Sequence, residues 1–247
     1  MRLALTGAAG FLGQRLLPRL AAHAVTATDI EPRPGDPPIG AADVRDPEAM
    51  RALCEKADTV IHLACAAWDD SLGVPANETR TLETRIKGTC NLLQAASQTQ
   101  TRRVVHISDL CILDGYADDI AVSEDFLPLP DTSARQQSIY LSEWAAREFA
   151  RQGDVEVLTL RLGALVDAQS LPADTRYTDG WLDIADAVDA VMRAIENEAA
   201  VRRGAWGLYN LAADVPGSRY SLLKIQAAPF DFFPQQDFAA WRRGDSP

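Results

Sequence analysis

Residues 6–13 read TGAAGFLG, and this stretch decides the fold. It follows a short apolar run and opens a segment, residues 11–22, whose apolar side chains recur at helical spacing. Gly7 suits a tight turn, Gly10 lets a backbone approach a pyrophosphate, and Gly13 lets the helix pack close to its strand. Because the free N–H groups at a helix start attract anions, the stretch predicts a dinucleotide-binding turn. A glycine turn that only joins two closely packed elements is the alternative interpretation.

The rest of the chain alternates predicted strands with predicted helices. Strands are predicted at residues 24–30, 59–64, 103–107, 155–162 and 206–211. Helices are predicted at residues 78–97, 138–151 and 182–195, with a short helix opening at 46–48 and loops at 31–40 and 167–180. Such alternation predicts an α/β fold, a Rossmann-type doubly wound parallel sheet. We expect residues 1–165 to form the dinucleotide-binding domain and residues 166–247 a small C-terminal substrate-binding portion interleaved with the last helix and strand.

The composition excludes several classes of partner. The chain has 247 residues, with 24 basic and 35 acidic side chains and a formal net charge of −11. That charge predicts no nucleic-acid partner and no attraction to an anionic membrane. No stretch approaches the roughly 18 apolar residues that a membrane-spanning helix needs, and the first residues do not form a signal peptide, so we expect a cytoplasmic protein. The four cysteines have no metal-ligand spacing, so we expect no metal site and four buried, small apolar side chains.

Two acidic residues are candidates for binding the adenosine half of a dinucleotide. Asp29 ends the second predicted strand, where a carboxylate accepts hydrogen bonds from ribose hydroxyls and repels a 2′-phosphate. This favours NAD(H) over NADP(H), although Arg33 is close enough in sequence to reach a 2′-phosphate. Asp43, followed by Val44, comes where the third strand should end, and its carboxylate could meet the adenine amino group. A strand-end cap for Asp29 and an ordinary loop position for Asp43 are the alternatives.

At this point the chain resembles a known family, the extended short-chain dehydrogenase/reductases, which include NAD-dependent epimerases and dehydratases. The resemblance runs from residue 1 to about residue 213. It rests on the TGxxGxxG turn and on HLACA at residues 62–66, KGTCNLL at 87–93, LRLG at 160–163 and YNL at 209–211.

The resemblance implies a cofactor, a substrate and an assembly. It implies NAD as the cofactor, a small-molecule substrate, and a homodimer built from the long helix and the helix that carries Tyr140. The residues expected to bind the cofactor are Gly7, Ala9, Gly10, Phe11, Leu12, Gly13, Asp29, Asp43, Val44, Leu63, Ala64, Cys65 and Tyr140.

The active-site motif departs from the family pattern. Family members carry a Tyr and a Lys four residues apart on one helix, with an acidic residue one turn further on. Counted from Glu148 as that acidic residue, Tyr140 is the Tyr and Trp144 stands where the Lys belongs. A phenol titrates near about 10, and Trp144 carries no charge that could lower this value. The resemblance therefore implies an atypical active site.

The hydroxyl that family members carry after the fifth strand is also missing. Its position falls on Asp109 or Leu110, with Ser108 beside it. The candidate catalytic residues are therefore Tyr140, Asp109 and Ser108. Asp109 could act as a base beside a protonated Tyr140, because a nearby carboxylate raises the pKa of a phenol. In the alternative interpretation, Asp109 caps a turn and Tyr140 is a core phenol.

Two functions stay open. The first is an NAD(H)-dependent oxidoreductase, epimerase or dehydratase that acts on a small sugar-like, hydroxy or keto substrate, since residues 167–180 are too short to build a large substrate cap. The second is a catalytically silent NAD(P)-binding sensor or scaffold. The missing Lys and hydroxyl favour the second function. The intact turn, Asp29 and Tyr140 favour the first, which we take as the working hypothesis.

Overall fold

The computed structural model describes residues 1–35, 37–172 and 174–243. Residues 36 and 173, which fall in the two predicted loops, and residues 244–247 lie outside the described residues.

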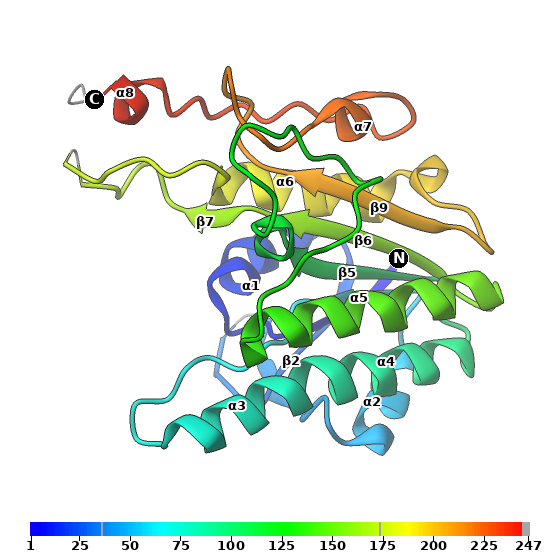
Figure 1. Cartoon of the computed structure of the whole chain (residues 1–247). Helices are drawn as coiled ribbons and strands as arrows, with labels where there is room; N and C mark the ends of the chain where they lie inside the picture. Colours follow the sequence, from blue (N-terminus) through cyan, green and yellow to red (C-terminus); the bar gives the residue numbers. More distant parts are fainter. Residues whose placement is uncertain (36, 173, 244–247) are drawn as a thin grey trace.

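Within the described ranges, seven parallel strands form one sheet in the order β3-β2-β1-β4-β5-β6-β9 (Figure 1). The strands are β1 Arg2–Thr6, β2 Ala24–Asp29, β3 Ile39–Ala41, β4 Thr59–His62, β5 Arg103–Asp109, β6 Glu156–Leu162 and β9 Trp206–Leu211. The strand order reverses between β1 and β4, and in such sheets ligands bind in the crevice that opens there, outside the carboxyl ends of the strands. The predicted doubly wound sheet is confirmed.

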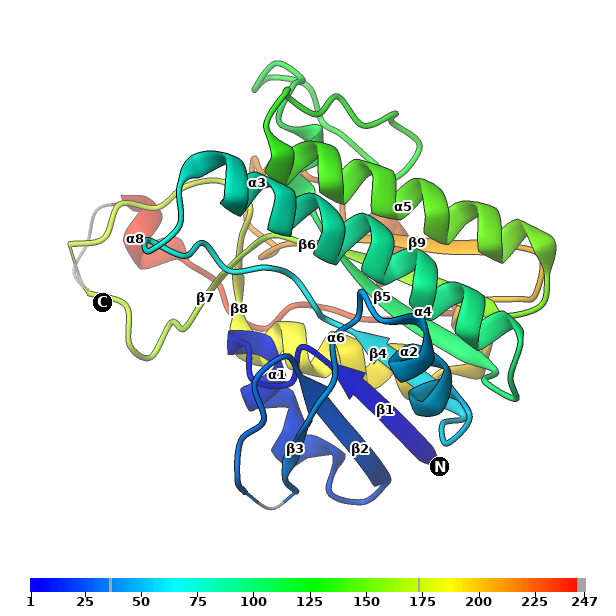
Figure 2. The same ribbon diagram turned by 90° about the horizontal axis from the view of Figure 1, so that it is seen from below.

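Helices cover both faces of the sheet. They are α1 Phe11–Leu16, α2 Pro47–Cys54, α3 Val74–Leu82, α4 Gly88–Ser97, α5 Ala134–Gln152, α6 Ile184–Glu196, α7 Leu223–Gln226 and α8 Ala239–Arg243, with the short turns η1 Leu17–Leu20, η2 Glu83–Lys87, η3 Leu110–Leu113 and η4 Glu198–Ala200. On one face α3 and α4 pack beside α5, and on the other α1 packs against α6 (Figure 2). The predicted long helix starts earlier than expected, at Val74, and contains a π-helical turn at η2.

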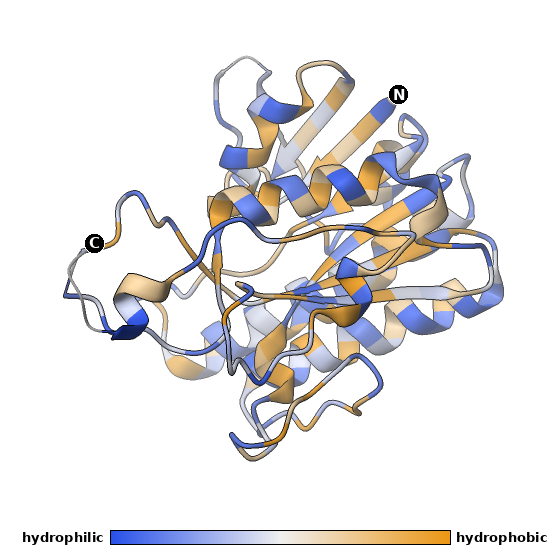
Figure 3. Cartoon of the chain, turned by 90° about the horizontal axis from the view of Figure 1, so that it is seen from above, coloured by the Kyte–Doolittle hydropathy of each residue, from blue (hydrophilic) through white to orange (hydrophobic). Residues whose placement is uncertain are grey.

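The strands alternate their side chains between these two layers. In β6, Leu158 and Leu160 join the apolar core that also contains α6 residues, whereas Val157 joins the core under α4 and α5. Arg161 therefore points to the α5 side, where it meets Glu143 of α5. Hydrophobic and hydrophilic residues are interleaved along each helix (Figure 3), as expected where one side of a helix is buried.

Helix boundaries follow capping residues. The predicted cap at Asp46 is confirmed, because its carboxylate accepts a hydrogen bond from the N–H of Glu48. Ser133 caps α5 by accepting a hydrogen bond from the N–H of Gln136, so this helix begins four residues before the predicted start. The predicted helix at 182–195 begins only at Ile184, because the residues before it form a strand.

A second, smaller sheet and a tail follow β6 in the chain. Strands β7 Ala164–Val166 and β8 Trp181–Asp183 pair in parallel, a feature that the sequence did not predict. The tail then returns over the loop that follows β5. The Arg219 guanidinium donates hydrogen bonds to the carbonyl oxygens of Leu113 (3.2 Å) and Tyr116 (2.7 Å) and pairs with the Asp118 carboxylate at 3.0 Å. These contacts hold the tail at the carboxyl ends of the strands.

Candidate cofactor and active site

The glycine turn after β1 is closed so tightly that it excludes side chains. Gly7 has a φ of +72°, and a Cβ there would lie 2.8 Å from the backbone N of Ala64. A Cβ on Gly13 would lie 2.6 Å from the carbonyl oxygen of Gly7. Among the described residues, the N–H groups of Phe11 and Leu12 at the start of α1 have no hydrogen-bond acceptor. The turn therefore presents open amides where a helix start favours an anion.

Asp29 lies directly against this turn. One carboxylate oxygen accepts a hydrogen bond from the N–H of Ala9 at 2.9 Å, and the other accepts one from the N–H of Ile30 at 2.8 Å. Each carboxylate oxygen can accept a second hydrogen bond, so the group can still bind two hydroxyls. The structure thus places the two predicted cofactor elements, turn and acid, side by side.

The segment that follows β4 forms the other wall of the turn. Leu63 donates its N–H to the carbonyl oxygen of Thr6 at 3.2 Å, and Gly7 packs on the backbone of Leu63 and Ala64. Cys65, the next residue, is exposed. These predicted cofactor-binding residues therefore lie next to the glycine turn.

The Asp43–Val44 segment is held in a different way. Arg45 binds both oxygens of the Asp43 carboxylate, with a closest contact of 2.7 Å, and this pairing lowers the pKa of Asp43. Val44 is buried, and its carbonyl oxygen accepts a hydrogen bond from the side chain of Asn91 at 3.1 Å. The Asp43 carboxylate already has a cationic partner within the protein.

The two acidic residues of α5 have opposite surroundings. Glu143 is buried and pairs with Arg161 at 2.8 Å, and each side chain is 2% exposed. Glu148 is partly exposed and accepts a hydrogen bond from Arg151 on the same helix at 3.0 Å. The acidic side chain that faces the sheet and the LRLG strand is therefore Glu143.

When Glu143 rather than Glu148 is taken as the acidic residue of the motif, the expected Tyr and Lys positions shift by five residues along α5. The Tyr position then falls on Arg135 and the Lys position on Ile139, which is buried. Tyr140 and Trp144 line a cavity next to β9 together with Glu143 and Arg161. Tyr140 also packs against the apolar cluster that contains Leu110.

The residues at the end of β5 bind partners other than Tyr140. Ser108 is buried and donates its hydroxyl hydrogen to Glu143 at 2.5 Å, so it supports the ion pair with Arg161. Asp109 accepts the N–H of Cys111 at 2.9 Å and pairs with Arg135 at 2.5 Å. Within the described part of the chain no hydrogen bond joins Asp109 to Tyr140, although Tyr140 packs against the apolar cluster that contains Leu110.

Arg135 is the site residue that the sequence analysis missed. Together with Ile139 and Glu143 it recurs every four residues, and this spacing puts all three on one side of a helix. This regular spacing could have drawn attention to Arg135, but the motif was aligned on Tyr140 instead. Arg135 places a cation at the strand ends, beside Asp109.

Two further polar groups flank this ion pair. Tyr220 from the tail donates its hydroxyl hydrogen to Asp114 at 2.7 Å, and partial burial raises the pKa of the Asp114 carboxyl. Burial, reinforced by the neighbouring Asp109, also raises the pKa of the Cys111 thiol. Cys111 is therefore a thiol at neutral pH and a poor nucleophile.

The buried histidines are packed between hydroxyl groups. His62 lies between the hydroxyls of Thr6 (2.8 Å) and Thr89 (3.1 Å), and burial lowers its pKa to about 4. His106 stacks on His62 with ring centroids 6.1 Å apart, and its pKa is also lowered by burial. Both rings are therefore neutral near pH 7.

The cysteines differ from the expectation of four buried side chains. Only Cys54 of the four is buried, whereas Cys65 is exposed and Cys90 and Cys111 are partly exposed. Whether a cysteine is buried depends on which helices or strands pack over it, and the spacing of the cysteines in the sequence does not show this. In the described ranges no cluster of His, Cys, Asp and Glu side chains could hold a metal ion, and no helix is long and apolar enough to cross a membrane.

Comparison with known proteins decides the family. A family model described as the NAD dependent epimerase/dehydratase family matches residues 3–170. The chain belongs to the NAD-dependent epimerase/dehydratase family. Its glycine turn, its LRLG strand and the order of its strands are those expected of this family.

Three known dehydrogenases are similar to the chain over most of its length. An L-arabinose 1-dehydrogenase (NAD(P)(+)) of Haloferax volcanii is 30% identical over 79% of this chain and 82% of that protein. A uronate dehydrogenase of Pseudomonas putida is 26% identical over 78% of this chain and 71% of that protein. The solved structure of a glucuronic acid dehydrogenase from Chromohalobacter salexigens has a TM-score of 0.82 and 25% identity, covering 98% of this chain and 87% of that one.

Proposed function

We propose that the chain binds NAD(H), in preference to NADP(H), and acts as an oxidoreductase or epimerase-type enzyme on a small sugar-like substrate. The observation that carries this proposal is the Asp29 carboxylate bound to the N–H of Ala9, directly beside the turn that Gly7 closes. The dehydrogenases of arabinose and uronate among its relatives support a sugar or sugar acid as the substrate class.

The residues of the turn fit such a cofactor. A side chain at Gly7 or Gly13 would meet backbone atoms, so the turn keeps its main chain bare, and the open amides of Phe11 and Leu12 suit a pyrophosphate. Asp29 would hold the adenosine ribose and repel a 2′-phosphate. When bound, the nicotinamide ring supplies hydride transfer.

The Asp109–Arg135 pair would take over the proton transfer and the charge stabilisation. Arg135 pairs with Asp109 at 2.5 Å and fixes the position of this carboxylate, which would accept a proton from a substrate hydroxyl placed beside it. The same cation favours negative charge on a substrate oxygen or carboxylate beside it. Its side chain is 61% exposed, so a substrate can reach it.

A second candidate function is NAD(H) binding without turnover. The specific observation that favours it is the chemistry of the sheet-facing side of α5, where Arg135 and Ile139 offer neither a phenol nor an amine. Tyr140 lines the cavity next to β9, together with Glu143 and Arg161. In this function the protein would bind the dinucleotide as a sensor or scaffold, without using it to oxidise or reduce a substrate.

One pair of measurements separates these functions. Calorimetry with NAD⁺ and NADP⁺ tests binding, and NADH absorbance with L-arabinose, glucuronate and galacturonate tests turnover. We expect binding of NAD⁺ and turnover of at least one sugar, with Asp109→Asn lowering kcat about 100-fold or more and Tyr140→Phe leaving it nearly unchanged. Binding without turnover of any sugar would favour the second function. Absence of binding of either dinucleotide would refute both.

A further inference from the structure

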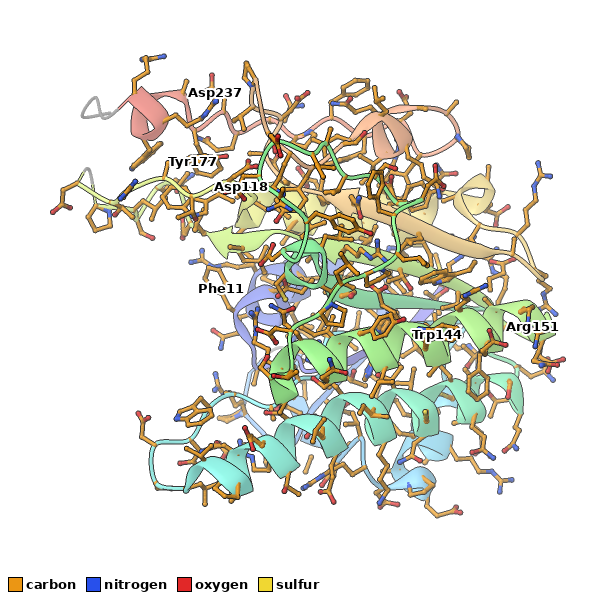
Figure 4. All side chains as sticks on the ribbon, viewed as in Figure 1. Phe11, Asp118, Trp144, Arg151, Tyr177 and Asp237 are labelled. Atoms are coloured by element: carbon orange, nitrogen blue, oxygen red, sulfur yellow. The ribbon has the colours of Figure 1, made fainter. Side chains whose placement is uncertain are left out.

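We propose a second ligand site on the α5 side of the sheet, which takes a flat cyclic amide, a ring in which a carbonyl group stands next to an N–H. A cavity of about 220 Å³ lies there, between α5, the segment that follows η3 and the edge strand β9. It is lined by residues 124–128 and by Tyr140, Glu143, Trp144, Arg147, Arg161, Trp206 and Leu208. Figure 4 shows Trp144 on α5 far from Phe11, which marks the glycine turn.

Arg161, which lines this cavity, carries a buried and unsatisfied hydrogen-bond donor. Arg161 uses Nε and Nη2 on Glu143, at 2.9 and 2.8 Å, but among the described residues its buried Nη1 has no partner. Leaving a buried donor unpaired costs about 1–3 kcal/mol, so an acceptor in the cavity would offset this cost. Because Glu143 already neutralises the guanidinium, a neutral carbonyl oxygen suits the site better than a second anion.

A hydrogen-bond acceptor lines the same cavity. One carboxylate oxygen of Glu124 accepts the backbone N–H of Asn210 at 2.7 Å, and the rest of the carboxylate remains able to accept a ligand N–H. Asn210 stands opposite Arg161 in the β6–β9 register, and neither end of its buried side-chain amide has a partner in the described structure. Acceptor and donor therefore occur together, as a carbonyl next to an N–H requires.

The walls select a flat ring. Tyr140 and Trp144 meet edge to face with centroids 6.3 Å apart, and Trp206 is fixed by its indole N–H, which donates to the Thr159 hydroxyl at 2.9 Å. Arg147 lies 5.2 Å from the ring centre of Trp144 and steadies that wall. At about 30 Å³ per water, the volume holds about seven water molecules, which is the size of one small ring and far too small for a dinucleotide.

The probe is 2-pyridone, added to the full chain with and without saturating NAD⁺. Binding is followed by saturation-transfer NMR and by tryptophan fluorescence. The matched probe is N-methyl-2-pyridone, which keeps the ring and carbonyl but lacks the N–H. We expect 2-pyridone to bind in both conditions and the methylated probe to bind about tenfold more weakly, because it leaves Glu124 without a donor.

Two variants locate the site. Trp144→Ala, at a residue that is 43% exposed, should weaken 2-pyridone binding about tenfold by removing a wall. Trp68→Ala removes an equally large exposed ring outside this cavity and should change the affinity less than about twofold. Three results would each overturn the proposal: no saturation transfer, equal binding to Trp144→Ala and wild type, or displacement of the probe by NAD⁺. An intact signal with the methylated probe would do the same, because it would remove the role of Glu124.

Discussion

The replacement Glu143→Leu tests which side of α5 faces the sheet. Glu143 accepts hydrogen bonds from the Ser108 hydroxyl and from two nitrogens of Arg161, and both charged side chains are 2% exposed. The leucine would leave the Arg161 cation buried without a counter-charge. Removing one partner of a buried pair costs about 3–5 kcal/mol, a large part of the roughly 5–15 kcal/mol that holds a domain together.

The measurement is urea unfolding followed by fluorescence, with a thermal melt as a second readout. For a chain of this size about 2–4 °C of Tm are lost per kcal/mol, so Glu143→Leu should lower Tm by about 6–20 °C. The matched control is Glu148→Leu on the same helix, whose exposed pair with Arg151 contributes about 0–1 kcal/mol. The double variant Glu143→Leu/Arg161→Met should recover much of the loss, because no charge then stays buried. A larger cost for Glu148→Leu than for Glu143→Leu would refute the reasoning, and so would a double variant no more stable than the single one.

Three further outcomes follow from the structure. Gly7→Ala should lower the stability by more than the roughly 1–2 kcal/mol of a left-handed backbone, because its Cβ also meets Ala64, whereas Gly204→Ala at φ +78°, with nothing within 4 Å, should show the backbone cost alone; urea unfolding compares them, and equal costs would contradict the packing argument. Asp29→Ala should weaken NAD⁺ binding in calorimetry by about tenfold or more while affecting NADP⁺ less, since it removes two ribose contacts and a repulsion; an unchanged NAD⁺ affinity would argue against its role. His62 has a pKa near 6.5 in the unfolded chain but about 4 in the folded protein, so the unfolded state binds more protons between these pH values. The free energy of unfolding therefore falls as the pH drops through that window, by about 3 kcal/mol at its lower end. Urea unfolding at several pH values should show a shallower fall in His62→Gln, and an identical slope would rule out His62 as the cause.

Much of the fold could be predicted because it depends on local patterns. Local sequence patterns a few residues long predict the Gly7 turn, the apolar strands and the Asp46 cap, and the structure contains each of them. The β7–β8 pair could not be predicted. Its two strands are three residues long, and what makes them strands is their pairing with each other across the loop at 167–180.

The candidate site was harder to predict because it depends on which side of α5 is buried. Glu143 and Glu148 are five residues apart, so they point to different sides of the helix, and the sequence alone does not show which one is buried. The contact that distinguishes them, with Arg161, links two elements far apart along the chain. The pairing of Asp109 with Arg135 is similar, since 26 residues separate its partners.

The last strand among the described residues, β9, is also the edge of the sheet, and this has a consequence during biosynthesis. Because the chain is synthesised from its N-terminus, β6 leaves the ribosome before residues 206–211 and has one unpaired edge until they pair with it. An open edge of this kind can recruit a strand from another molecule. A polypeptide truncated before Trp206 should therefore aggregate. A polypeptide that extends through Arg219 contains both the missing strand and the Arg219 side chain that hydrogen-bonds the loop after β5.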